Sequence, residues 1–411
     1  MRNSSDGSDD TQVRPVNLRG HLLAVPVDFR IALTRIRFSH HVLIQLRADD
    51  TTGVGEGILY RTLPHQAGAL FSSLIRPAFA DGRVLNASSE RQRDWLAELT
   101  TASPALAYAV DTALWDLRGR AEGRSVAELL GGTQRRHISV TEQIFIRDWP
   151  TAEAELDDIL SRGTRRLKVK IGVNPQADLE AIRRVRAFVG PDVEIRVDVN
   201  HAYTLAEGEP LYRALADLGV LALEEPLRLR DWPRLRTLRQ RVGLPVILDE
   251  SVLSLEDLQA AIAQEAVDIL NIKLTRVGGI SQALRYAEEC RQHGVQVALG
   301  CTEDLGVGTA AIVHLAAALP EVHSTEGLGS IRLGFDLISE PWNVQDGTLA
   351  VPQGPGLGVT LPAEWQDRLP RRLRCFDLDD GGWLLTAFSH YALWLQRASN
   401  VMWRVRRKVE R

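Results

Sequence analysis

Five short segments of this sequence each place charged side chains at the end of a predicted β-strand, at steps of roughly 25 residues. That step is the length of one strand–helix unit of an eight-fold barrel, in which the carboxyl ends of all strands meet at one pocket. The segments end on Lys168 and Lys170, Asp198 and Asn200, Glu224 and Glu225, Asp249 and Glu250, and Lys273. The spacing therefore predicts a single pocket that holds carboxylates and lysines together.

The composition sets broad limits on what the chain can do. Its 411 residues suffice for a barrel of about 250 residues and a second domain. A hydrophobic share of 45%, a charged share of 25% and a net charge of −4 are ordinary for a globular protein and predict no nucleic-acid partner. Three scattered cysteines without a CxxC pair indicate a reducing, cytoplasmic setting. The first residues lack a signal-peptide core, and no apolar run has membrane-spanning length.

The pattern of polar and apolar residues divides the chain into five parts. Residues 1–14 are rich in Ser, Asp and Gly, and we expect them to be disordered. Residues 15–133 show three alternating strands followed by helical periods, which predicts an α+β capping domain. Strands alternate with helices over 134–335, which predicts a parallel barrel. The turn-rich residues 336–375 should pack back on the first domain, and 376–411 form an amphipathic, basic extension.

Two of these assignments have alternatives. An open, doubly wound sheet competes with the barrel, but it would need a Gly-rich phosphate-binding turn after its first strand. No such turn follows the first predicted strand at 138–146, which favours the barrel. The C-terminal extension could lie on an anionic membrane or on a partner subunit, whereas the simpler interpretations are a helix packed on its own barrel or a poorly ordered extension.

The acidic residues indicate a metal site. Asp198, Glu224 and Asp249 end three successive predicted strands. Three carboxylates so close together would repel one another unless a cation lay between them. Oxygen ligands without Cys or His favour Mg²⁺ or Mn²⁺ over Zn²⁺. Alternatively, each acid could merely cap the helix that follows it, which is less economical for three acids in register.

The lysines indicate proton transfer. Lys168 and Lys170 are two residues apart in one strand, so both side chains point to the same side. Buried lysines are costly outside a polar pocket, and like-charge repulsion from Lys168 would favour a neutral, basic amine on Lys170. Lys273, on the sixth strand, would lie across the barrel from them. The alternative is that strand-end lysines extend their ammonium groups to solvent.

Four further polar residues are candidates for supporting roles. Asn200 could bind metal-bound water or substrate, and Glu250 could orient a ligand or a lysine or cap a helix. Glu303 follows the seventh strand and Glu326 lies near the eighth, where each could cap a helix or contact a substrate amine.

Taken together, the segments KVK, DVN, EEP, DES and NIK resemble the enolase superfamily, and within it the muconate lactonizing enzyme subgroup. The resemblance extends over about residues 15–375, because AVDTALWDLRGRAEGRSVAELLGG and GPGLGV are similar to the end of the family's capping domain and to its C-terminal return. The resemblance implies an α/β fold, a modified TIM barrel (β/α)₇β without an eighth helix, under an α+β cap formed by the N-terminal region and the return segment.

The resemblance also implies roles for individual residues. It implies that Asp198, Glu224 and Asp249 bind Mg²⁺, with Mn²⁺ as a possible substitute. Lys170 and Lys273 would then be acid/base catalysts on opposite faces of the substrate α-carbon. Lys168 would tune Lys170 and touch the substrate carboxylate.

We therefore expect an enzyme that removes the α-proton of a small carboxylate to give a metal-stabilised enediolate. Lysines on both faces favour a racemase or epimerase of an N-acyl amino acid, dipeptide or related acid. A muconate-type cycloisomerase and a dehydratase of the o-succinylbenzoate synthase type are the alternatives, and a non-catalytic binding barrel is a remote one. Glu326 resembles the single Glu of cycloisomerases, whereas the family's dipeptide epimerases carry an Asp-x-Asp pair there. A homo-oligomer is expected because barrels of this kind commonly assemble.

Overall fold

The computed structural model describes residues 16–31, 34–59, 62–80, 83–86, 89–132, 134–327 and 329–378. The predicted disordered segment and nearly all of the C-terminal extension lie outside these residues. Among the described helices, none is both long and apolar enough to cross a membrane. The domain boundaries given above stay predictions.

The capping domain begins with an antiparallel sheet, as the alternating pattern predicts. Its strands are β1 (Val16–Ile31), β2 (Thr34–Ala48) and β3 (Thr51–Ile58). A fourth strand, β14 (Arg374–Asp377), comes from the far end of the described chain and pairs with β1, so the sheet order is β14-β1-β2-β3. The return segment therefore packs on the capping domain, as the sequence predicts.

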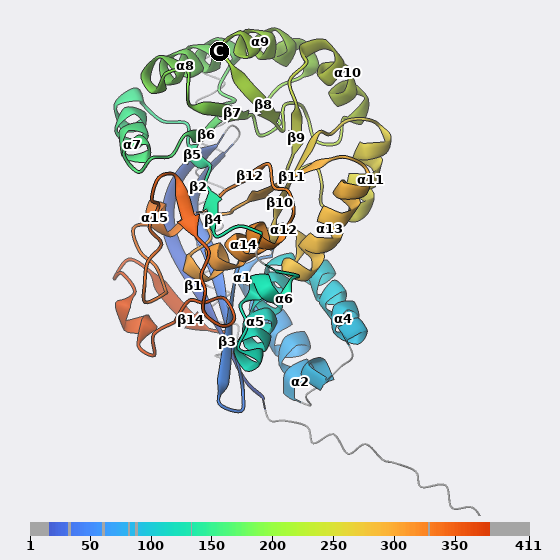
Figure 1. Ribbon diagram of the computed structural model, residues 1–411, viewed down its shortest axis with the longest axis vertical. Helices are drawn as coiled ribbons and strands as arrows, with labels where there is room; N and C mark the ends of the chain where they lie inside the picture. Colours follow the sequence, from blue (N-terminus) through green and yellow to red (C-terminus); the bar gives the residue numbers. More distant parts are fainter. Residues whose placement is uncertain are drawn as a thin grey trace, which may run out of the picture.

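The helices of the capping domain cover one face of this sheet (Figure 1). They are α1 (Pro64–Leu70), the π-helix η1 (Phe71–Ile75), α2 (Arg76–Ala80), α3 (Arg83–Asn86), α4 (Ser89–Ala102), α5 (Pro104–Glu122) and α6 (Val126–Leu129). The longest, α5, starts at the cap Ser103, whose hydroxyl accepts the backbone N–H of Leu106, and ends at Gly123 in the left-handed conformation.

Three glycines on one face of β3 allow α5 to lie directly against the sheet. A Cβ atom built on Gly53, Gly55 or Gly57 would come within 2.3 Å of a backbone carbonyl oxygen of α5. For Gly55 this oxygen belongs to Ala109, at 1.9 Å. Any larger residue would force the helix and the strand apart.

The barrel consists of eight parallel strands in sequence order, which confirms the predicted fold class. They are β5 (Glu142–Ile144), β6 (Arg166–Lys170), β7 (Glu194–Asp198), β8 (Val220–Glu224), β9 (Val246–Leu248), β10 (Ile269–Lys273), β11 (Gln296–Gly300) and β12 (Ser324–Thr325). A parallel bridge between Val140 and Thr325, with a 2.8 Å hydrogen bond from Thr141 N to Thr325 O, closes the ring beside β5. The sheet is thus a barrel rather than an open, doubly wound sheet.

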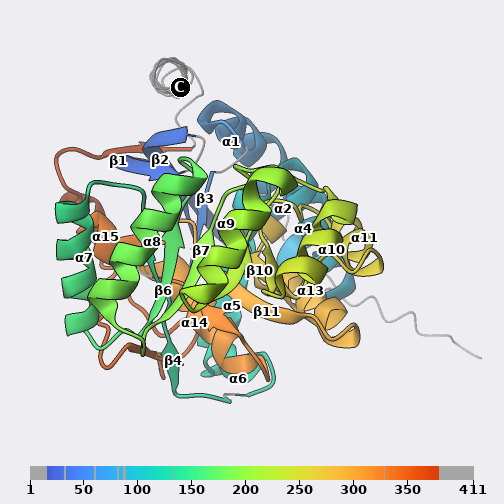
Figure 2. The same cartoon turned by 90° about the horizontal axis from the view of Figure 1, so that it is seen from above.

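The crossover helices surround this ring. They are α7 (Trp149–Ser161), α8 (Pro175–Val189), α9 (Leu205–Asp217), α10 (Trp232–Val242), α11 (Leu255–Ala263), α12 (Leu274–Val277), α13 (Ile280–Gln292) and α14 (Gly306–Ala318). Figure 2 shows α7, α8 and α9 side by side along the outside of the sheet. Directly after β12, the described residues contain the short α15 (Gly329–Leu333) in place of a full eighth crossover helix. This matches the expected (β/α)₇β arrangement.

The first predicted barrel strand, 138–146, is wrong in its extent. It is divided into β4 (His137–Ser139) and β5, and β4 leaves the barrel to pair antiparallel with β13 (Thr348–Ala350). The pairing partner arrives about 200 residues later in the chain, so local pattern could not show the break. A 3₁₀ helix, η2 (Trp365–Arg368), follows β13.

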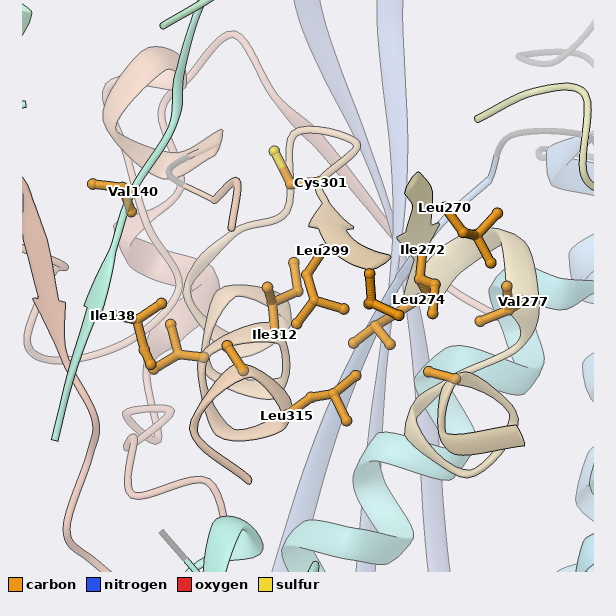
Figure 3. Packing of buried hydrophobic residues seen from close by; sticks show 14 of the residues in the cluster. Ile138, Val140, Leu270, Ile272, Leu274, Val277, Leu299, Cys301, Ile312 and Leu315 are labelled. Atoms are coloured by element: carbon orange, nitrogen blue, oxygen red, sulfur yellow. The ribbon is translucent and has the colours of Figure 1, made fainter. Parts of the chain in front are cut away.

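The barrel has an apolar outer shell, and its interior is polar at the carboxyl ends of the strands. Alternate residues of β10 illustrate this: Leu270 and Ile272 belong to the large hydrophobic cluster between strands and helices, part of which Figure 3 shows, while Asn271 and Lys273 have the opposite orientation. A separate small cluster is formed by Ala222, Ile247, Ile269 and Ala298, three of which lie two residues before the polar residues Glu224, Asp249 and Asn271. It fills the inside of the barrel below the polar side chains.

We predict that Gly55→Ala lowers the free energy of unfolding by about 3 kcal/mol, because the new methyl group overpacks the β3–α5 contact. Urea unfolding would measure this. The matched control is Gly354→Ala, where a Cβ would meet nothing closer than 3.4 Å and the change should stay within about 0.5 kcal/mol. Equal values for the two variants would contradict the close-approach explanation.

A second prediction concerns His314, which is buried in α14. Its Nδ1 accepts the N–H of Ala127 (3.3 Å) and its Nε2 donates to Leu357 O (3.0 Å), and burial lowers the pKa of the imidazole to about 4. The unfolded chain therefore binds a proton more readily, and stability is lost as pH falls from about 6.5 towards 4. Between these pH values, the free energy of unfolding of the wild-type protein should fall by about 2 to 3 kcal/mol more than that of His314→Gln.

The measurement is urea unfolding of both proteins between pH 7 and 4. The exposed His293→Gln variant serves as the control and should keep the wild-type pH dependence. Parallel curves for wild type and His314→Gln would rule out this role for His314.

Candidate active site

The three predicted metal-binding acids are all buried at the carboxyl ends of adjacent strands. Asp198 ends β7, Glu224 ends β8, and Asp249 directly follows β9. The negative charge of Asp249 acts on Asp198, and that of Asp198 acts on Glu224, so the three carboxylates share one electrostatic environment. Asp198 pairs with Glu224 in the register of β7 and β8, whereas Asp249 lies two residues beyond Ile247, the partner of Glu224 on β9.

The three predicted lysines are also buried and pair with these acids. Lys170 Nζ lies 2.5 Å from Asp198 Oδ2, and Lys273 Nζ lies 2.8 Å from Asp249 Oδ2. Lys168 Nζ lies 3.1 Å from Glu224 Oε1. The alternative that these lysines extend to solvent is wrong, because at most 9% of each residue is exposed.

The described residues include no group of three or more Asp, Glu, His or Cys side chains already arranged around a metal position. Each predicted ligand carboxylate contacts a lysine instead, so a metal ion would have to replace some of these contacts. One observation fits a cation: Glu224 Oε2 is buried without a hydrogen-bond donor, with the Arg196 guanidinium 3.8 Å away. Burial raises the pKa of Glu224 to about 7 despite the neighbouring Lys168. Three hard oxygen donors, one of them lacking a partner, suit Mg²⁺.

Glu326, which directly follows β12, is held in place by other side chains of the barrel. Its Oε1 lies 2.6 Å from Lys168 Nζ and also contacts Arg196, and its Oε2 accepts a 2.9 Å hydrogen bond from Gln143 Nε2. Burial alone would raise the pKa of Glu326, but Lys168 and Arg196 outweigh it and lower the pKa to about 2. Glu326 is therefore an ion-pair partner of the lysine cluster, and it does not cap a helix.

Arg196 was not predicted as a site residue. It lies on β7 two residues before Asp198, so its side chain enters the barrel on the same face. It contacts Ser324 Oγ as well as Glu326. Counting back from Asp198 by the two-residue period of a β-strand could have identified Arg196.

Lys168 lies between Glu326 and the acids Glu224 and Asp198. Burial opposes its charge, but the carboxylates of Glu224, Glu326 and Asp198 outweigh burial and raise the pKa of Lys168. The structure therefore holds Lys168 as a cation. Its expected effect on Lys170 stays a prediction.

Asn200 and Glu250 form a chain that ends on Lys170. Lys170 Nζ donates to Asn200 Oδ1 (3.2 Å), and Asn200 Nδ2 donates to Glu250 Oε1 (2.9 Å). Asn200 has a φ of 44°, in the left-handed region that few residues adopt. The two residues are placed to orient a lysine, one of the roles suggested for Glu250.

The neighbouring Glu225 shapes the loop that carries Asp249. Its Oε1 accepts the backbone N–H groups of Asp249 (2.6 Å) and Ser251 (2.8 Å), and its Oε2 accepts the Ser251 hydroxyl (2.6 Å). Glu225 also has a positive φ of 44°. It acts on Asp249 through the backbone.

Two more arginines complete the surroundings. Arg332 Nε, on α15, donates to Glu303 Oε2 (2.9 Å), and Glu303 itself has a positive φ of 65°. Arg276, three residues after Lys273, contacts Asp249 Oδ1. Arg276 was missed by the sequence analysis, because it lies beyond the strand and its position depends on α12.

Two family models match most of the chain. Residues 19–131 match the family model described as mandelate racemase / muconate lactonizing enzyme, N-terminal domain, and residues 151–365 match the model described as enolase C-terminal domain-like. Together the two matches span both the cap and the barrel.

Similar curated proteins have different named activities. A chloromuconate cycloisomerase from Pseudomonas sp. (strain P51) is 30% identical over 341 residues, covering 81% of this chain and 92% of that protein. An N-succinylamino acid racemase from Amycolatopsis sp. is 37% identical over 264 residues, covering 64% of this chain and 70% of that protein.

Solved structures show the same fold. Muconate lactonizing enzyme from Pseudomonas fluorescens superposes with a TM-score of 0.80 at 24% identity, covering 87% of this chain and 100% of that chain. A dipeptide epimerase from Enterococcus faecalis V583, complexed with Mg and the dipeptide L-Leu-L-Tyr, has a TM-score of 0.76 at 25% identity, covering 84% and 99%.

We predict that Arg196→Met lowers the free energy of unfolding by about 3 to 5 kcal/mol, because Glu326 then loses one of its two buried cationic partners. Chemical denaturation would measure the change. Arg291→Met, which breaks an exposed ion pair with Glu288, should cost less than about 1 kcal/mol. A similarly small effect of Arg196→Met would show that the Arg196–Glu326 pair is not needed.

Proposed function

This chain belongs to the mandelate racemase/muconate lactonizing enzyme family of the enolase superfamily, and on that premise we propose that it removes and returns the α-proton of a small carboxylic acid. The observation that carries the proposal is the placement of two buried lysines on opposite walls of the barrel. Lys170 ends β6 and Lys273 ends β10, which lie four strands apart in either direction around the closed ring of eight. A substrate between them would expose one face of its α-carbon to each amine.

We propose that Asp198, Glu224 and Asp249 hold a divalent cation, Mg²⁺ or Mn²⁺, at this site. When bound, the ion would stabilise the negative charge that develops on the substrate carboxylate as the α-proton leaves. The support is the set of three adjacent buried carboxylates and the unsatisfied oxygen of Glu224. The complex of a related dipeptide epimerase with Mg agrees with this assignment.

The remaining residues would bind the substrate or hold the catalytic groups in position. Lys168 is held as a cation and is placed to attract the carboxylate of the substrate. Asn200 and Glu250 fix the ammonium group of Lys170, while Arg276 and Glu225 fix Asp249, from which Lys273 is 2.8 Å away. Each catalytic lysine thus has its own set of supporting contacts, which suits a reaction with two separate proton-transfer steps.

Racemisation or epimerisation is the outcome that two opposed lysines support best, because one can take the proton and the other can return it to the opposite face. An N-acyl amino acid is the preferred substrate class. Glu326 is already paired with Lys168 and Arg196, so it offers less to the free ammonium group of a dipeptide. The similarity to an N-succinylamino acid racemase also favours an N-acyl amino acid as the substrate.

A second candidate is cycloisomerisation of a muconate-like diacid, in which one lysine moves the proton and the other stabilises charge. Two observations favour it: the single Glu326 after β12, and the match to a chloromuconate cycloisomerase over most of the chain. It predicts that a diacid is consumed to a lactone.

The test is solvent exchange in D₂O, followed by mass spectrometry and chiral analysis, with Mg²⁺ and both enantiomers of several N-acyl amino acids. Wild-type protein should incorporate one deuterium at the α-carbon of either enantiomer. Lys170→Ala and Lys273→Ala should each slow racemisation by roughly 10²- to 10⁴-fold, with each variant losing exchange mainly for the enantiomer whose proton faces the missing amine.

The exposed Arg213→Gln variant is the control and should keep full activity. No exchange with any acid in the presence of Mg²⁺ would contradict the proposal. Consumption of a muconate-like diacid, without exchange of the N-acyl amino acids, would favour the second candidate instead.

A further inference from the structure

Asn271 is a buried polar residue of β10 that lies inside the barrel, two residues before Lys273. Its neighbours in the strand, Leu270 and Ile272, belong to the hydrophobic cluster outside the barrel (Figure 3), so the amide group of Asn271 points inwards. Its Nδ2 donates a hydrogen bond to Glu224 Oε1 at 3.1 Å. A neutral side chain is therefore in direct contact with a carboxylate of the predicted cation site.

Asn271 belongs to a layer of four polar side chains inside the barrel. In an eight-stranded barrel, the side chains of one layer come from alternate strands. Here β6 contributes Lys168, β8 contributes Glu224, β10 contributes Asn271, and Glu326 directly follows β12. The strands β6 and β10 lie on opposite sides of β8 in the sheet. Glu224 is thus held from two directions, by Lys168 on one side and by Asn271 on the other.

Both of these donors contact the same oxygen atom of Glu224. Oε1 lies 3.1 Å from Lys168 Nζ and 3.1 Å from Asn271 Nδ2. Oε2 is buried and accepts no hydrogen bond from the described residues, because Arg196 Nη2 is 3.8 Å away. The two contacts at Oε1 therefore fix the orientation of the carboxylate, and its other oxygen keeps no hydrogen-bond donor within the protein.

The amide group of Asn271 fits against Gly300 of β11. A Cβ atom on Gly300 would come within 2.6 Å of Asn271 Oδ1 and 2.9 Å of Nδ2. Oδ1 itself is buried and accepts no hydrogen bond from the described part of the chain. An unpaired buried oxygen is unfavourable, and a leucine of similar size would not have this cost. A local cost of this kind is expected where a residue serves binding rather than stability.

We propose that Asn271 is a positioning residue for the cation: together with Lys168, it holds the Glu224 carboxylate in the orientation that binds the divalent ion. The inference rests on the cation site of the proposed function, to which it adds a residue that donates to a ligand without adding charge. Partners of metal ligands in other proteins commonly change metal affinity tenfold or more when they are replaced.

Mn²⁺ titration of the full-length protein, followed by electron paramagnetic resonance, tests this role in a double-mutant cycle. The four proteins are wild type, Asn271→Leu, Glu224→Ala and the double variant. We expect Asn271→Leu to weaken Mn²⁺ binding about tenfold in the wild-type background. In the Glu224→Ala background it should change the affinity by less than about twofold, because the carboxylate through which Asn271 acts is already absent.

Two further variants support the measurement. Asn271→Ala removes the same amide group without adding bulk, and it should weaken Mn²⁺ binding as much as Asn271→Leu does. Thr112→Val is the matched control, because Thr112 is a buried residue of α5 whose hydroxyl also lacks a hydrogen-bond partner among the described residues. This control should bind Mn²⁺ like wild type. Urea unfolding would check that each variant is folded.

Wild-type affinity in both Asn271→Leu and Asn271→Ala would overturn the role of Asn271 and leave the cation site of the proposed function standing. An equal loss of affinity in the wild-type and Glu224→Ala backgrounds would also overturn it, because the substitution would then act through packing rather than through Glu224. A wild-type protein that binds no Mn²⁺ would overturn both this inference and the cation site.

Discussion

The structure depends on the balance of opposite charges inside a closed barrel. Asp198 and Asp249 each contact a buried lysine, and each of these ions would be costly to bury alone. Burial of both partners of a pair is tolerable because the barrel walls bring them to hydrogen-bonding distance. Under the proposed function, a cation that binds these acids would compete with the lysines, which would then be available to a substrate.

The rest of the fold holds this balance in place. Ala222, Ile247, Ile269 and Ala298 fill the barrel below the charges, and the ring is closed beside β5. The cap is fixed to the barrel by the buried Glu56 of β3, whose carboxylate accepts the N–H groups of Leu305 (2.9 Å) and Gly308 (2.8 Å) at the start of α14. Thr275, just after Lys273, exchanges hydrogen bonds with the backbone of Ile58 at the end of β3. The cap therefore contacts α12, the helix that directly follows Lys273.

Sequence reasoning found the strand ends because their signal is local. A charged residue that interrupts an apolar strand, as in the segments ending on Lys170, Asp198 and Lys273, is visible without any knowledge of its neighbours. What it could not find depends on distant contacts. The division between β4 and β5 follows from pairing with β13 near residue 350, and the partners of Glu326 come from β5, β6 and β7. Arg196 and Arg276 resemble ordinary arginines until the barrel closes around them.

The central claim is that Asp198, Glu224 and Asp249 together bind one divalent cation. Mn²⁺ titration followed by electron paramagnetic resonance tests it most directly, because free and bound ions are counted without any substrate. We predict one tight site per chain, which Asp198→Asn, Glu224→Gln and Asp249→Asn each weaken at least tenfold, while Glu303→Gln leaves it unchanged. A chain that binds no Mn²⁺, or binds it equally well after all three substitutions, would contradict the account.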